Sequence, residues 1–128
     1  MRDDSPNATA EYVIDVDIKR NPSGRGNSRD GRFDYAFKPD VAVIKDSNTS
    51  MVYRLTTTSD PALRISGIYT TDARYQLGAP RMARDGRSVT LLNVNTQQML
   101  IHVSLQVADI EDGSLAHYDP QVLNDPPL

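Results

Sequence analysis

The alternation of apolar and polar side chains is the feature that most constrains this chain. It is strictest over residues 99–107, where every second side chain is apolar: Met99, Ile101, Val103, Leu105 and Val107. A period of two places such side chains on one face of a β-strand. Ile14, Val16 and Ile18 repeat the pattern within residues 12–19, and no stretch shows the 3.6-residue period of an amphipathic helix. The alternation therefore predicts an all-β fold.

Turn residues divide the chain into about eight short predicted strands. The predicted strands cover residues 12–19, 33–37, 41–44, 51–57, 63–69, 74–77, 88–94 and 99–107. Asp85-Gly86, between Met82 and residues 88–94, is typical of a hairpin turn. All but two of the 17 acidic residues are Asp, which favours turns over helix interiors. We therefore expect an antiparallel β-sandwich of immunoglobulin-like type.

The length of 128 residues fits one domain. We expect residues 1–10 to be a disordered lead and residues 11–128 to form a single β-sandwich domain. The last ten residues, 119–128, contain three prolines. Proline cannot donate to a sheet ladder, so we expect this segment to be extended and laid along an edge.

Charge and composition exclude several classes of protein. The formal net charge is -3 and there is no Cys, which argues against a generally basic nucleic-acid binder, disulfides and thiolate metal sites. No apolar run approaches the ~18 residues of a membrane span. We expect a cytoplasmic protein with no cofactor, metal, nucleic-acid or membrane partner. Edge strands leave a homo-oligomer open as a partner class.

The charged side chains are unevenly distributed. The Gly/Ser/Arg segment 20–32 could bind phosphate, but it lacks aromatic platforms, and a solvated hairpin loop is the favoured interpretation. No Lys or Arg follows Arg87, although five acids do: Asp109, Glu111, Asp112, Asp119 and Asp125. These carboxyls could raise one another's pKa and divide acid and base roles. The favoured alternative is that these acids face the segment 20–32, here called the arginine loop, across the fold.

Asp-Pro dipeptides have covalent chemistry of their own. The aspartyl carboxyl can close a five-membered ring on its own main-chain carbonyl carbon, and proline nitrogen is a fair leaving group when protonated. Alternatively, another Asp could activate a water against that carbonyl. Asp60-Pro61 is typical of a turn. Asp119-Pro120, in surroundings without cations, is the more reactive candidate.

The two histidines could assist such chemistry. His102 lies on the outward face of the 99–107 strand beside Ser104, and His117 lies two residues before Asp119. No Gly-x-Ser-x-Gly elbow occurs, and nothing in the spacing fixes a serine near either ring, so no catalytic triad is predicted. If residues 99–107 and 115–119 pair, His102 projects from the strand next to that of Asp119.

The C-terminal run Asp119-Pro120-Gln121-Val122, followed by Asn124 and a proline, resembles the small bacterial DP-EP family. Strand alternation throughout and the Asp-Pro nine residues from the terminus extend the resemblance over roughly residues 11–128. The resemblance implies a β-sandwich that cuts its own chain at this bond. It makes Asp119 the residue before the scissile bond and Pro120 the new amino terminus.

The chain departs from that family in its lysines. The resemblance implies a lysine that forms an amide with the freed aspartyl group, but Lys19, Lys38 and Lys45 all lie in the first 45 residues. We therefore do not expect this amide. The candidates for groups that assist Asp119 are His102, Asp109, His117 and Tyr118, and His102 replaces the missing lysine most directly.

Two functions from different classes follow. The first is single-turnover, aspartic-peptidase-like self-cleavage at Asp119-Pro120, with the peptide 120–128 kept as the protein's own partner through Val122 and Leu123. The alternative is a non-catalytic β-sandwich that binds a partner or assembles through edge strands.

Overall fold

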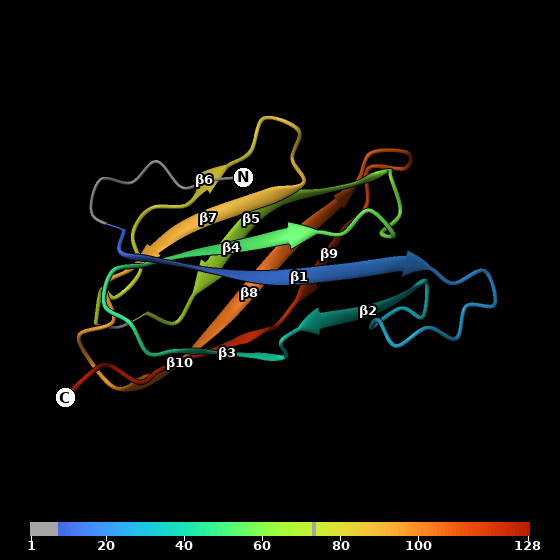
Figure 1. The fold of residues 1–128 in the computed structure, drawn as a ribbon. Coiled ribbons are helices and arrows are strands. Elements are labelled where there is room, and N and C mark those ends of the chain that lie inside the picture. The colour runs from blue at the N-terminus through green and yellow to red at the C-terminus, as the bar shows by residue number, and fades with distance from the viewer. Residues whose placement is uncertain (1–7, 73) are drawn as a thin grey trace.

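The fold is built from ten β-strands in a computed structural model that describes residues 8–72 and 74–128 (Figure 1). The strands are β1 (Ala10–Arg20), β2 (Phe33–Lys38), β3 (Val41–Ile44), β4 (Thr49–Leu55), β5 (Leu63–Thr70), β6 (Arg81–Met82), β7 (Ser88–Asn93), β8 (Met99–Asp109), β9 (Leu115–Tyr118) and β10 (Gln121–Asn124). No helix occurs within these two ranges. The predicted all-β class is confirmed.

Two sheets share one hydrophobic core. One has the order β2-β1-β4-β7-β6, and the other has the order β3-β10-β8-β5 with β9 paired to β8. In Figure 1 the strands β1, β4 and β7 lie in front of β5 and β8. Ile14, Val16 and Ile18 from β1 are buried in the same cluster as the alternate apolar residues of β8. The alternation therefore identified the inward faces of both sheets correctly.

Two strand pairs correct the prediction of a purely antiparallel sandwich. β1 pairs in parallel with β4, and β3 pairs in parallel with β10. Between β1 and β4 the chain runs through β2 and then β3, which belongs to the other sheet, and such a long excursion lets the returning strand run in the same direction. Alternation of side chains carries no information on strand direction, so the sequence did not reveal these pairs.

The C-terminal segment also departs from its predicted place. It does not lie along an edge, because β10 runs between β3 and β8 inside the second sheet. Pro120 precedes β10 and Pro126 follows it, so neither interrupts the strand. The prolines therefore limit the length of the strand without excluding it from the sheet.

Three smaller differences concern boundaries and a loop. β1 begins at Ala10, and the Thr9 N–H donates to the Asn48 carbonyl at 2.9 Å, so regular structure starts before the predicted boundary at residue 11. The rest of the predicted lead, residues 1–7, lies outside the described residues. The predicted strand 74–77 is reduced to an isolated antiparallel bridge between Leu77 and Asn93, because the Asp72 carboxylate accepts the Gln76 and Leu77 N–H groups at 2.8 Å and turns the chain. The predicted hairpin at Asp85-Gly86 is confirmed by the pairing of β6 with β7.

Candidate functional site

The Asp119–Pro120 bond lies in the middle of one continuous strand. β8 pairs with β9 through Leu105 and Tyr118, and with β10 through His102 and Gln121, in a single unbroken register. This register places Asp119 opposite Ser104. Across the gap between the two strands, the Val103 N–H donates to the Pro120 carbonyl at 3.0 Å. β9 and β10 are therefore two halves of one strand, divided at the candidate scissile bond.

Proline explains the division. Pro120 has no N–H, so the Val103 carbonyl opposite it receives no hydrogen bond from this position. The neighbouring residues Asp119 and Ser104 form a non-hydrogen-bonded antiparallel pair, the arrangement that brings facing side chains closest, with Cα atoms about 4.5 Å apart. Pro120 is buried, whereas Asp119 is exposed. The carboxylate beside the bond is thus open to solvent.

The predicted site residues gather on the solvent-facing side of the second sheet. His102, His117 and Asp119 are all exposed there, on neighbouring strands. The expectation that no serine is fixed near either ring is wrong, because Ser104 Oγ lies 3.3 Å from His117 Nδ1. The sequence could not show this contact, since it joins β8 to β9 and depends on their register.

The two histidines differ in their relation to Asp119. His102 and Asp119 line the same shallow depression, together with Tyr69 and Ser104. The Nδ1 atom of His102 lies 3.4 Å from the Gln121 side-chain amide, and its Nε2 atom has no hydrogen bond to any described residue. His117 lines a different depression beside the arginine loop. Of the two histidines, His102 is therefore the one that shares a depression with Asp119.

Asp119 itself is unpaired. Within residues 8–72 and 74–128, no hydrogen bond or ion pair involves its carboxylate, so the group is available as a nucleophile or base. Tyr118 next to it points inward, 4.7 Å between ring centroids from Tyr35, and burial raises its pKa to about 12. Tyr118 is therefore not placed to assist at the solvent-facing side.

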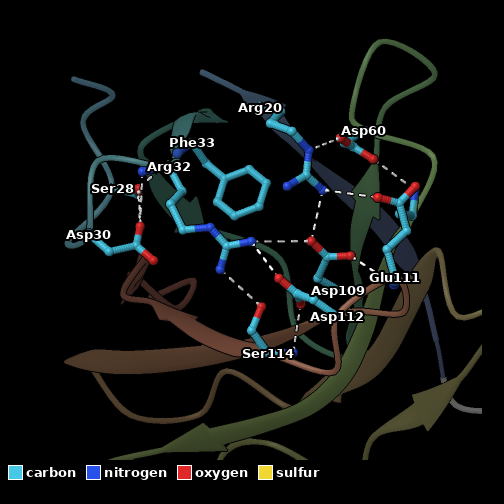
Figure 2. Close-up of polar contacts among 11 residues, drawn as sticks. Arg20, Ser28, Asp30, Arg32, Phe33, Asp60, Asp109, Glu111, Asp112 and Ser114 are labelled. Carbon is cyan, nitrogen blue, oxygen red and sulfur yellow. Dashed lines mark hydrogen bonds and ion pairs between the residues drawn. The ribbon is translucent and has the colours of Figure 1, made fainter. Parts of the chain in front are cut away.

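A second cluster of charges lies at one end of the sandwich, where two arginines flank Phe33 (Figure 2). Their guanidinium carbons stand 5.0 Å (Arg20) and 5.4 Å (Arg32) from the ring centroid. Arg20 binds Asp60 at 2.9 Å and Asp109 at 2.8 Å through its Nε and Nη2 atoms. We call this group, with Arg32 and its partners, the arginine cluster.

The acidic partners of Arg32 follow β8. Arg32 Nη2 lies 2.7 Å from Asp112 and 3.6 Å from Asp109, and its Nη1 donates to Ser114. The interpretation that these acids face the arginine loop is confirmed for Asp109, Asp112 and Glu111, the last of which lies 3.9 Å from Arg20 Nη2, whereas Asp119 is not part of the cluster. Hydrogen bonds from Ser114, together with Arg32, lower the pKa of Asp112 to about 2. The pKa of Asp112 is therefore lowered, whereas mutual repulsion of neighbouring carboxyls would raise it.

The loop between β1 and β2 is built by its own hydrogen bonds. Gly26 N–H donates to the Gly31 carbonyl at 2.8 Å, and the Gly31 N–H donates to the Ser28 carbonyl at 3.0 Å. A β-carbon on Gly26 would overlap the Phe33 carbonyl. This close approach fixes Phe33 beneath the two arginines.

Replacing Gly26 by Ala is therefore expected to lower the free energy of unfolding by about 2 kcal/mol, the usual scale of forced overpacking. Urea unfolding measures the change. Gly24→Ala is the matched control in the same loop, because its β-carbon meets nothing within 4 Å and only the positive φ of 74° opposes it. An equal loss in both variants would contradict the assigned contact.

The lowered pKa values of buried or hydrogen-bonded carboxylates predict that the folded protein loses stability in acid. Hydrogen bonds from Thr56 lower the pKa of Asp17; for Asp60, burial is outweighed by the Ala62 N–H and Arg20, so its pKa is lowered as well. A lowered folded-state pKa stabilises the protein above the unfolded value of about 4 and is lost as pH falls through the folded value. The urea midpoint should thus fall between about pH 4 and pH 2. In the Asp112→Asn variant this fall should be less steep. A urea midpoint that does not change with pH would contradict the prediction.

The described residues contain no group of three or more His, Cys, Asp or Glu placed to hold a metal ion. They also contain no helix long and apolar enough to cross a membrane.

No family model matches the chain, and no curated protein matches it. Among solved structures, a crystal structure of the cysteine protease inhibitor EhICP2 from Entamoeba histolytica is similar, with a TM-score of 0.43 and 11% sequence identity. The match covers 92% of this chain and 96% of that one. A similarity of this size carries no inference about the present chain.

Proposed function

We propose that this protein cuts its own chain once, at the Asp119–Pro120 bond. The observation that carries the proposal is the position of the Asp119 carboxylate. It lies exposed and unpaired beside a prolyl bond that interrupts an otherwise continuous strand, and it shares a depression with His102. The resemblance to the DP-EP family and the immunoglobulin-like class expected from the sequence belong to the same proposal.

The strand geometry suits attack from the solvent side. Peptide planes in a strand lie close to the plane of the sheet, so a nucleophile reaches the carbonyl carbon from one face. An Asp119 Oδ atom attacks its own main-chain carbonyl carbon and closes a five-membered anhydride, while the C–N bond to Pro120 breaks. The proline nitrogen takes a proton, and water then opens the anhydride to two carboxyl groups.

A second route gives the same products. In this route the Asp119 carboxylate takes a proton from a water molecule that attacks the same carbonyl carbon. Both routes require a proton at the leaving nitrogen, and in this proposal His102, which lines the same depression as Asp119, donates it. Both yield the fragments 1–119 and 120–128.

His102→Gln is expected to slow cleavage by roughly 100-fold, the lower range for a general acid. Glutamine keeps hydrogen-bonding capacity without a proton to give at neutral pH. The rate of fragment appearance, followed by mass spectrometry in denaturant, measures the effect. His117→Gln is the matched control on the neighbouring strand and should change the rate much less. Equal rates in His102→Gln and wild type would remove His102 from the mechanism.

The small fragment is expected to remain bound after the cut. β10 is paired on both sides, and Val122 and Asn124 are fully buried. We expect fragments 1–119 and 120–128 to co-elute in size-exclusion chromatography in native buffer and to separate in denaturant. Sequencing of the separated peptide tests the proposal, since it must begin Pro-Gln-Val-Leu. A different amino terminus would contradict cleavage at this bond.

A further inference from the structure

We propose that the groove between β3 and β8 is a selective binding site for extended peptides. In the cut protein, the nonapeptide 120–128 exchanges there with the same segment of a second copy of the chain. This inference rests on the proposed function, because the segment leaves its groove freely only after the bond to Asp119 is broken.

The groove holds a peptide backbone from both sides. Val122 pairs with Ala42 of β3 in parallel and with Ile101 of β8 in antiparallel orientation. Beyond the strand, the Asp125 N–H donates to the Ile44 carbonyl at 2.8 Å. Main-chain hydrogen bonds of this kind provide affinity for any extended segment, as in the addition of a strand to a sheet.

Selectivity comes from the side chains that face the core. Alternation in a strand points Pro120, Val122 and Asn124 inward, and all three are buried. Val122 lies within the hydrophobic cluster and is 0% exposed. A polar or charged side chain at this position would therefore be buried among apolar groups without a partner.

Asn124 is recognised by a buried amide partner on the opposite sheet. Asn93 Nδ2 donates to Asn124 Oδ1 at 2.7 Å, and Asn124 Nδ2 donates to Asn93 Oδ1 at 3.1 Å. Gln76 Oε1 lies 3.4 Å from the same Asn124 nitrogen. A peptide without an amide here leaves the buried Asn93 Nδ2 without its oxygen acceptor, although Asn93 Oδ1 still accepts the Asn95 N–H at 3.0 Å, and the lost bond disfavours binding. The groove therefore selects peptides with the pattern Pro-x-Val-x-Asn.

The cut also creates a pair of opposite charges. The new amino terminus at Pro120 is a secondary amine, and α-amino groups have pKa values of about 8, so it carries a positive charge at neutral pH. It forms beside Asp119, which then has both a side-chain and a main-chain carboxylate. A free amino terminus thus favours the groove, and an acetylated one lacks this attraction.

The test uses the full-length protein after its cleavage has been scored in denaturant. A synthetic, isotopically heavy peptide with the sequence 120–128 is added in large excess, and native mass spectrometry follows replacement of the light peptide. We expect heavy peptide to enter the cut wild-type protein. A peptide carrying Asn124→Ala should enter roughly 10- to 100-fold less well. Uncut Asp119→Ala protein should take up none, because its groove is filled by its own tethered segment.

Each outcome decides a separate point. Absence of fragments in the wild type refutes the proposed self-cleavage, and the exchange with it. Fragments without uptake of heavy peptide, even in urea just below the unfolding transition, refute the exchange alone. Equal uptake of the Asn124→Ala peptide refutes the selectivity. Uptake by Asp119→Ala protein refutes the location of the site in this groove.

Discussion

Replacing Asp119 by Ala is expected to abolish cleavage, so that the full-length mass persists unchanged. Both routes need this carboxylate, either as the nucleophile that forms the anhydride or as the base that activates water. The side chain is exposed and unpaired in the part of the chain that the structure describes, so its loss leaves no buried group without a partner. Mass spectrometry in denaturant, with circular dichroism as a check of folding, measures the result.

Asp125→Ala is the matched control, because Asp125-Pro126 is the same dipeptide in the same segment. Asp125 lies beyond β10, outside the depression that His102 shares with Asp119. We expect this variant to be cut at the wild-type rate. Cleavage that continued in Asp119→Ala, or stopped in Asp125→Ala, would show that the reacting carboxylate has been wrongly assigned.

Asp109→Ala is expected to have the largest effect on stability, a loss of about 3 kcal/mol in the free energy of unfolding. Asp109 is 3% exposed and binds Arg20 at 2.8 Å, and its other oxygen accepts the Glu111 N–H at 3.0 Å. Its removal leaves two guanidinium groups close together without their central anion. Because both arginines are more than one third exposed, water screens part of the penalty, which places the value at the low end for a broken buried pair. Urea unfolding measures the loss.

Asp112→Ala provides the contrast. Asp112 binds the same Arg32 at 2.7 Å, but its side chain is 45% exposed, and solvent screens an exposed ion pair, so we expect this variant to lose much less stability than Asp109→Ala. If the two variants lost the same stability, burial of Asp109 would not be what makes the arginine cluster important.

The sequence predicted the strands well and their arrangement poorly. The alternation in residues 99–107 identified β8 and its inward face, because burial on one side of a sheet imposes a period of two. The same alternation is unchanged when a strand runs in the opposite direction, so the parallel pairs β1–β4 and β3–β10 were missed. The place of β10 inside the sheet was missed because three prolines suggested an edge, although they only border the strand.

The candidate site was partly visible in the sequence. Asp119 and Pro120 stay predictions from their covalent chemistry and the resemblance to the DP-EP family. The strand pairing on which the choice of His102 depended is seen in the register of β8 with β9. The contact of Ser104 with His117 was not foreseen, because it depends on which residues face each other across the strands. Similarly, the sequence suggested that acids would face the arginine loop, but the stacking of Arg20 and Arg32 on Phe33 requires the folded loop.

The central claim, that Asp119–Pro120 is cut by the protein itself, is tested most directly by the intact mass of the purified chain. The protein is held for days at mildly acidic and at neutral pH, and samples are measured in denaturant. We predict that the full-length mass declines while fragments 1–119 and 120–128 appear together, their summed mass exceeding that of the chain by one water. A full-length mass that stays unchanged under both conditions would contradict the account.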